Sequence, residues 1–196
     1  MTHEAQKNDQ HTHLKYKLCI SGAAETSHCG PDALDKAKML GHEIIQQGAV
    51  LVTGATTGAP YWGAIGAKDA GGFVIGLSPA SSEREHVKKY KLPIDYHDII
   101  IYTGFGYAGR NLLLTRSADA VLIVCGRMGT LNEFTIAFED DKPIGVLTGT
   151  GGLADDIQDL IRRAHRGPGK VIFDSQPRAL VEKVMELVKR EKVVAE

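Results

Sequence analysis

The sequence has little cysteine: Cys19, Cys29 and Cys125 are the three among 196 residues. The number is odd and no CxxC pair occurs, which argues against a disulfide framework and fits a reducing cytoplasm. We therefore expect thiols, with Cys125 as a small packing residue at the end of a strand. His28-Cys29 is interpreted as an ordinary loop pair, with a reactive thiol at Cys29 as the alternative.

Long apolar runs and an excess of one charge are also missing. The longest apolar runs are the length of strands, far below the ~20 residues that a membrane-spanning helix needs. The N-terminus lacks the apolar stretch of a signal peptide, so we expect a cytoplasmic protein. The net charge is -1, which gives no dominant basic surface. Neither a membrane nor nucleic acid is therefore expected as a main partner.

The first thirteen residues, MTHEAQKNDQHTH, are polar and have no apolar periodicity. We interpret residues 1–13 as a flexible tail. Its histidines, His3, His11 and His13, are interpreted as solvated side chains rather than as metal ligands. No repeat or internal linker divides residues 14–196, whose length suits one domain.

Short β-rich runs alternate with helical stretches along this domain. Most of the runs are continuously apolar, which is typical of strands buried on both faces of a parallel sheet. We therefore predict an α/β fold, a three-layer Rossmann-like sandwich with a mostly parallel sheet of about seven strands. The expected strands are 16–21, 49–53, 73–77, 98–102, 120–124, 143–147 and 170–173, and the expected helices are 32–47, 61–70, 81–89, 107–117, 130–140, 153–164 and 177–189.

The familiar nucleotide-binding motifs are absent. The first strand-to-helix turn reads Ser21-Gly-Ala-Ala-Glu25 instead of GxGxxG, and no acidic residue follows the second strand, where Val52-Thr53 stand. No GxxxxGK[ST] occurs either. A standard NAD site and a P-loop are therefore both disfavoured. GxSxG and HExxH are missing too, and no metal site is predicted.

Glycine, by contrast, is frequent, with 22 residues concentrated after the expected strands. Ligands of open parallel sheets bind outside the carboxyl ends of the strands. Glycine lets backbone N–H groups approach an anion there, and a helix N-terminus favours negative charge. Several such loops together favour a phosphate site over tight turns alone. The expected phosphate-binding residues are Gly22, Gly54, Thr57, Gly58, Gly126, Arg127, Met128, Gly129 and Thr130.

The segment 125–133, CGRMGTLNE, admits two interpretations. Thr130 and Glu133 have the T-x-x-E spacing of a capping box, in which Thr130 caps the helix and Glu133 bonds back to it. In the alternative, Glu133 faces a ligand cleft and binds ribose hydroxyls or acts in acid–base chemistry. Arg127 either grips a phosphate or fills the groove. Tyr61–Trp62 either stacks on a base or packs against a neighbouring helix or subunit.

A set of short motifs, each weak alone, follows a specific order over roughly residues 15–150. The motifs are GATTGAPYWGA (54–64), GGFVIG (71–76), GRN (109–111) with SADA (117–120), GRMGTLNE (126–133) and KP (142–143). Together they resemble the LOG-like (SLOG) superfamily. That superfamily includes nucleoside 5'-monophosphate phosphoribohydrolases, often mislabelled lysine decarboxylases, as well as molybdenum-cofactor carriers and DNA-processing proteins. The resemblance implies a Rossmann-like fold and a homodimer or higher homo-oligomer.

The family's PGGxGTxxE motif falls on residues 125–133, where Cys125 and Arg127 replace its proline and second glycine. The family's Arg-Lys pair falls on Arg110-Asn111, and a further glutamate of the hydrolases falls on Ile136. These departures put LOG catalysis in doubt and leave phosphate binding intact.

The resemblance, together with the loops, therefore implies binding of a phosphorylated nucleotide-like ligand, either a nucleoside monophosphate or the molybdenum cofactor. The alternative is a phosphoribohydrolase that cleaves an N-glycosidic bond, with Glu133 and Arg110 as its catalytic residues. A DNA-associated module is the third hypothesis.

Overall fold

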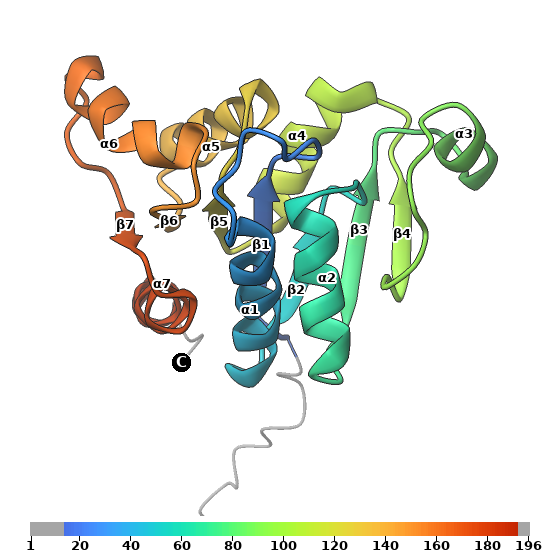
Figure 1. Cartoon of the computed structure of the whole chain (residues 1–196), viewed down its shortest axis with the longest axis horizontal. Helices are drawn as coiled ribbons and strands as arrows, with labels where there is room; N and C mark the ends of the chain where they lie inside the picture. The colour runs from blue at the N-terminus through green and yellow to red at the C-terminus, as the bar shows by residue number, and fades with distance from the viewer. Residues whose placement is uncertain (1–13, 192–196) are drawn as a thin grey trace, which may run out of the picture.

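A computed structural model describes residues 14–191, in which seven strands alternate with seven helices. The strands are β1 (Lys17–Gly22), β2 (Val50–Thr53), β3 (Val74–Ser78), β4 (Ile99–Tyr102), β5 (Ala120–Val124), β6 (Ile144–Leu147) and β7 (Val171–Asp174). The helices are α1 (Ala33–Gln46), α2 (Ala59–Asp69), α3 (Glu83–Lys88), α4 (Gly106–Ser117), α5 (Met128–Glu139), α6 (Leu153–Ala164) and α7 (Pro177–Glu191) (Figure 1). The predicted tail, residues 1–13, lies outside the described residues.

The seven strands form one sheet in the order β4-β3-β2-β1-β5-β6-β7, and every neighbouring pair is parallel. All residues of β2 and β5 are buried, which is why their sequences are continuously apolar. The edge strand β4 alternates between exposed and half-buried residues. The predicted α/β fold with a parallel seven-stranded sheet is confirmed.

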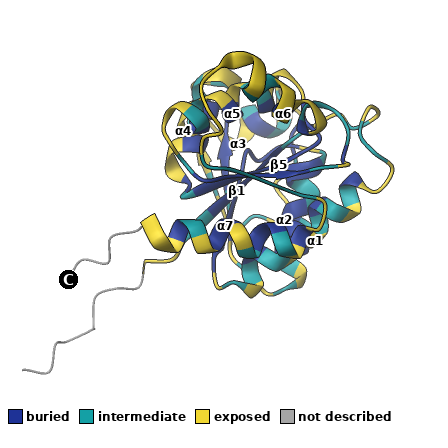
Figure 2. Ribbon diagram, turned by 90° about the vertical axis from the view of Figure 1, so that its left-hand side faces the viewer, coloured by how far each residue is buried: buried dark blue, intermediate teal, exposed yellow. Residues whose placement is uncertain are grey.

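Two helical layers cover the sheet, as Figure 2 shows, with α1, α2 and α7 on one side and α4, α5 and α6 on the other. Each layer closes its own apolar core. Leu40 of α1 and Val184 of α7 belong to the first core, while Leu114 of α4 and Ile157 of α6 belong to the second. The strands supply alternate side chains to the two cores, so that Leu122 of β5 faces one and Ile123 the other.

Backbone contact joins α1 and α2. A Cβ atom added to Gly41 would lie 1.9 Å from the Gly63 carbonyl oxygen, and one added to Gly66 would lie 1.8 Å from that of Lys38. Only glycine allows this approach. The small, apolar composition around residues 61–70 therefore serves close helix packing.

The strand order changes direction at the centre of the sheet. From β1 the chain runs outward to β2, β3 and β4, and then crosses to β5 on the other side of β1. The loops that follow β1 and β5 start side by side and lead to helices on opposite faces of the sheet, α1 and α5. The carboxyl edge at such a point is where ligands of this sheet type bind. Among residues 14–191, none of the helices combines the length and apolar character needed to cross a membrane.

Candidate functional site

A cavity of about 560 Å³ opens at the carboxyl edge of the sheet, beside the ends of β1 and β5. Its volume is within the range of small-ligand pockets. The fold brings together most of the residues that the sequence singled out. Those that line the cavity are Gly22, Gly54, Thr57, Arg110, Arg127, Gly129, Thr130 and Glu133.

Glu133 holds the centre of a buried polar network in the cavity wall. The hydroxyl group of Ser21, in β1, donates a hydrogen bond to Glu133 Oε2. Arg110, in α4, donates from Nη1 to Glu133 Oε1 at 3.3 Å. Asn111 can also donate to Glu133 Oε1, at 2.9 Å, when its side-chain amide is turned so that the nitrogen also donates to the Tyr107 carbonyl. Two elements, β1 and α4, therefore supply the partners of this carboxyl group of α5.

Burial is the largest influence on the ionisation of Glu133. The side chain is 6% exposed, and the loss of hydration raises its pKa, while Arg110 and the Ser21 hydroxyl act in the opposite direction. A carboxyl group with a raised pKa remains protonated to higher pH than an exposed one. Glu133 can therefore hold a proton in the cavity wall as well as accept hydrogen bonds there.

Arg110 is the buried cation of the cavity. It is 5% exposed, and its Nε has no hydrogen-bond partner among residues 14–191. Its guanidinium lies against Gly54, where an added Cβ atom would be 1.9 Å from Nη1. A glycine at this position therefore makes room for the guanidinium. A buried guanidinium with an unused donor is a place where an anionic ligand would gain a charge-assisted hydrogen bond.

The predicted capping box is wrong, because α5 begins at Met128 rather than at Thr130. Arg127 is the N-cap, and no side chain caps the helix. The reason is the turn before the helix, where Gly126 has φ of 101°. This turn redirects the chain, so that Arg127 is extended and the first helical turn starts at the next residue, Met128. Thr130 lies against Gly126, and Glu133 bonds to other elements. The first-turn N–H groups of α5 lack intrahelical acceptors and so can receive an anion.

Three cations and one carboxyl group line the cavity: Lys91, Arg110, Arg127 and Glu133. The Arg127 side chain is half exposed, and its Nη1 lies 3.5 Å from Glu25 Oε2. An exposed ion pair of this length contributes little, so Arg127 can turn toward a ligand at small cost. The Arg127 backbone is extended, with φ of -135°, and carries none of the strain that a left-handed turn would impose.

Three of the expected phosphate-binding residues lie outside the cavity lining. Gly58 is the N-cap of α2 and packs on the Ala23 carbonyl. Gly126 shapes the turn before α5, and the Met128 side chain is exposed. Tyr61–Trp62 is also outside the lining: Trp62 packs on the core beneath α1 and α2, and Tyr61 contacts Tyr96 edge to face.

The sequence interpretation missed another part of the cavity lining. It comprises Tyr90, Lys91 and Leu92, from the loop after α3, together with Tyr107 of α4. The Tyr90 and Tyr107 rings meet edge to face at 5.5 Å. Tyr107 precedes Arg110 by three residues, which is a helical spacing that could have signalled a shared face. The loop with Tyr90 carries no such signal.

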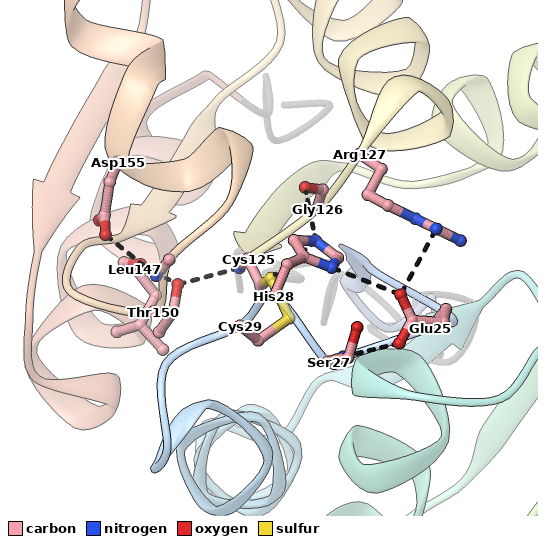
Figure 3. The surroundings of a disulfide bond; sticks show 11 residues. Glu25, Ser27, His28, Cys29, Cys125, Gly126, Arg127, Leu147, Thr150 and Asp155 are labelled. Atoms are coloured by element: carbon pink, nitrogen blue, oxygen red, sulfur yellow. Dashed lines mark hydrogen bonds and ion pairs between the residues drawn. A yellow bond between two sulfur atoms is a disulfide. The ribbon is translucent and has the colours of Figure 1, made fainter.

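The structure corrects the interpretation of two cysteines. Cys29, in the loop after β1, and Cys125, at the end of β5, form a disulfide with 5.6 Å between Cα atoms (Figure 3). The prediction of thiols at these positions is therefore wrong in this structure. The cause is the fold, because neighbouring parallel strands end side by side. Cys19 is free and buried, and burial raises the pKa of its thiol.

Comparisons with known proteins agree with this architecture. The profile of the SLOG cluster4 family matches residues 15–181. An uncharacterized protein from Archaeoglobus fulgidus is 33% identical over 131 residues, which are 67% of this chain and 81% of the relative.

Solved structures with similar folds include two proteins that handle the molybdenum cofactor. The molybdenum cofactor binding protein from Rippkaea orientalis superposes with a TM-score of 0.74 at 28% identity, over 90% of this chain and 99% of that one. The molybdenum cofactor carrier protein from Chlamydomonas reinhardtii gives 0.72 at 25% identity, with the same coverage of 90% and 99%. DNA processing protein A from Helicobacter pylori gives 0.62 at 18% identity, covering 88% and 81%, which is a likeness of fold alone.

Proposed function

We propose that this chain, which belongs to the SLOG cluster4 family, binds a phosphorylated, pterin-type cofactor of the molybdenum-cofactor class in the cavity beside β1 and β5. The two solved relatives at 28% and 25% identity are described as binding or carrying that cofactor. Their likeness supports a small phosphorylated ligand, and the geometry of the cavity supports where it binds.

The observation that carries the proposal is the position of Arg110. Its guanidinium is buried in the cavity wall with Nε unpartnered among the described residues, and the first-turn N–H groups of α5, at Gly129 and Thr130, border the same cavity. A buried donor without an acceptor is costly. A phosphate oxygen would supply that acceptor and would also meet Arg127 and Thr130, which line the same cavity.

The remaining lining residues fit a flat heterocycle attached to the phosphate. Tyr90 and Tyr107 line the cavity and meet edge to face, and aromatic side chains pack well on planar ring systems. The volume of about 560 Å³ accommodates a ligand of nucleotide size. When bound, the cofactor would supply its own redox-active metal, while this chain would hold and shield it.

Glu133 fits binding better than hydrolysis. Both its oxygens are engaged by Ser21 and Arg110, and a catalytic carboxylate would have to leave these partners to reach a ribose carbon. With these partners kept, Glu133 instead holds the Arg110 guanidinium in the cavity wall, where a ligand phosphate would contact it. Ligand binding is therefore favoured over cleavage of an N-glycosidic bond.

The test is a titration of the purified full chain with molybdenum cofactor released from a donor enzyme, and in parallel with AMP, by equilibrium dialysis. We expect the cofactor to bind more tightly than AMP. Arg127→Gln removes one charge-assisted contact and should weaken cofactor binding roughly tenfold to hundredfold. Arg178→Gln, on α7 outside the cavity, is the matched control.

Two outcomes would overturn the proposal. Equal affinity of wild type and Arg127→Gln for every phosphorylated ligand would mean that the ligand binds at another site or does not bind at all. Release of free adenine from AMP, lost in Glu133→Gln, would instead identify a phosphoribohydrolase.

A further inference from the structure

Beside the cavity lies a second cluster of chemically active side chains. His28, Cys29 and Cys125 each offer one ligand atom, and these atoms all lie within 4.8 Å of one another. Figure 3 shows His28 over the disulfide, with its ring between Cys125 and Glu25. None of the three residues lines the cavity. The cluster is therefore separate from the proposed cofactor site.

The distance between His28 and Cys125 matches that of two ligands in a tetrahedral metal site. His28 Nε2 lies 3.5 Å from Cys125 Sγ. Two ligands of a tetrahedral zinc ion, with Zn–S of about 2.3 Å and Zn–N of about 2.0 Å, are themselves about 3.5 Å apart. The imidazole thus already stands where a zinc ligand would stand relative to Cys125. Only the two sulfur atoms are closer than a metal site needs, because they are bonded.

The histidine of the cluster has a carboxylate partner. His28 Nδ1 lies 3.6 Å from Glu25 Oε2, so a carboxylate faces the ring nitrogen that would not bind the metal. Such carboxylate–histidine pairs orient the ring of metal-binding histidines. His28 is exposed and Cys29 half buried, which gives an ion a route from solvent.

The backbone around Cys125 is fixed by a neighbouring loop. Cys125 N–H donates to Thr150 Oγ1 at 2.9 Å, and the Ala154 N–H donates to the Cys125 carbonyl at 2.8 Å. On the other side, the Gly30 N–H donates to the Thr150 carbonyl at 2.8 Å. Opening of the disulfide would therefore leave both cysteines held near each other by the loop around Thr150.

We propose that His28, Cys29 and Cys125 form a redox-gated site for a thiophilic divalent cation of the Zn²⁺ type when the disulfide is reduced. Two equivalents of a thiol reductant break the S–S bond and deliver two electrons and two protons, and the reductant leaves as its own disulfide. Zn²⁺ then binds both sulfurs and His28 Nε2, and two thiol protons pass to solvent. Water fills the fourth position, as in three-ligand zinc sites. A small-molecule disulfide closes the site by thiol–disulfide exchange: it takes up the two electrons and two protons from solvent, leaves as two thiols, and the zinc ion dissociates as the Cys29–Cys125 bond forms again.

The test is a Co²⁺ and Zn²⁺ titration of the full chain, reduced and oxidised, without any phosphorylated ligand. His3, His11 and His13 are replaced by alanine in the background chain, since their imidazoles could bind the same ions. We expect about one ion per reduced chain and a thiolate-to-cobalt charge-transfer band. The oxidised chain should show neither.

Single substitutions then assign the ligands. Cys29→Ser should remove the charge-transfer band or weaken it severely. His28→Ala should weaken metal binding at least as much as Glu25→Gln does. Glu25→Gln should cost about tenfold to hundredfold in metal affinity. Cys19→Ala and His42→Ala are the matched controls, and both should bind like the background chain.

Either of two results would overturn the proposal: a reduced background chain that binds neither ion, or binding that persists unchanged in both His28→Ala and Cys29→Ser. His28 is exposed, so His28→Ala is expected to fold. Its thermal unfolding without metal, compared with the background chain, separates a lost ligand from a lost fold.

Discussion

At the scale of single residues, several side chains singled out from the sequence line the cavity, but their bonding partners were not predicted. Glu133 was predicted to cap its own helix or to face a ligand. It lines the cavity, and it bonds to Ser21 from β1 and Arg110 from α4. Residues 21 and 133 are far apart in the chain, so only the sheet order could reveal this contact. Short-range motif spacing favoured the local capping bond instead.

Ligand affinity should depend on pH through Glu133. Burial raises the pKa of this carboxyl group, so it stays neutral to higher pH than an exposed glutamate. Above its pKa it becomes a negative charge beside a bound phosphate. We therefore expect the affinity of wild type, relative to Glu133→Gln, to fall as pH rises through the raised pKa and to level off above it. Calorimetric titration at several pH values measures the ratio.

The comparison with Glu133→Gln removes a competing effect. The second ionisation of a phosphate monoester, with a pKa of about 6, strengthens binding as pH rises and acts equally on both chains. Glu83→Gln, on the exposed start of α3, serves as a charge control. A ratio that does not change with pH would show that Glu133 keeps one protonation state throughout.

At the scale of elements, the strands and most helices were predictable because the apolar runs and their spacing report burial directly. The strand Ala120–Val124 and the helix Leu153–Ala164 have the predicted bounds. The start of α5 was not predictable in the same way. It depends on a backbone turn at Gly126 and Cys125, both with positive φ, and a cysteine gives no sequence signal for that conformation.

The contact between α1 and α2 should be intolerant of a single methyl group. Gly41→Ala would place Cβ 1.9 Å from the Gly63 carbonyl and force the two helices apart. We expect a loss of about 1–3 kcal/mol in the free energy of unfolding, typical of overpacking. Denaturation in urea, followed by circular dichroism, measures the change.

Gly129→Ala is the matched control for this substitution. Gly129 is also a helical glycine, but an added Cβ meets nothing within 4 Å. Alanine has the higher helix propensity, so stability should be equal or slightly greater. A similar loss in both variants would refute close packing as the cause.

At the scale of the whole molecule, one face carries apolar side chains that its own helices leave uncovered. Ile99 and Ile101 of β4 pair with Ile75 and Leu77 of β3, and residues paired in this way point to the same side of a sheet. Leu77 belongs to the core beneath α4, so the isoleucines lie on the α4 side. Both are about half exposed, at 49% and 50%.

We expect copies of this chain to associate through these isoleucines and through the exposed Leu112 and Leu113 of α4, the helix that covers this side of the sheet. An exposed apolar edge strand is a common site of association between identical chains. Wild type should then be a homodimer or larger by light scattering. Ile101→Glu combined with Leu113→Glu should shift it to monomer, while Met39→Glu, on the opposite helical layer, should not. A wild type that is monomeric throughout would contradict this expectation.

The cysteine count led to the wrong expectation that Cys29 and Cys125 are thiols. An odd number of cysteines says nothing about which strand ends adjoin, and the 96 residues between Cys29 and Cys125 hide their proximity. Knowledge of the order β2-β1-β5 would have placed the loops after β1 and β5 together. The fold class was therefore within reach of the sequence, whereas the pairing of loops required the strand order.

The disulfide also determines which part of the chain extends under a pulling force. A bond between Cys29 and Cys125 closes a ring that contains α1 to α4 and β2 to β5. A force applied to the two ends of the chain would not load the segment inside this ring. Roughly 340 Å of contour length would therefore not extend until the disulfide opened. A metal ion bound by the same two sulfurs would cross-link the same two residues. The oxidised and the metal-bound chain would thus extend alike, and the reduced, metal-free chain would extend further.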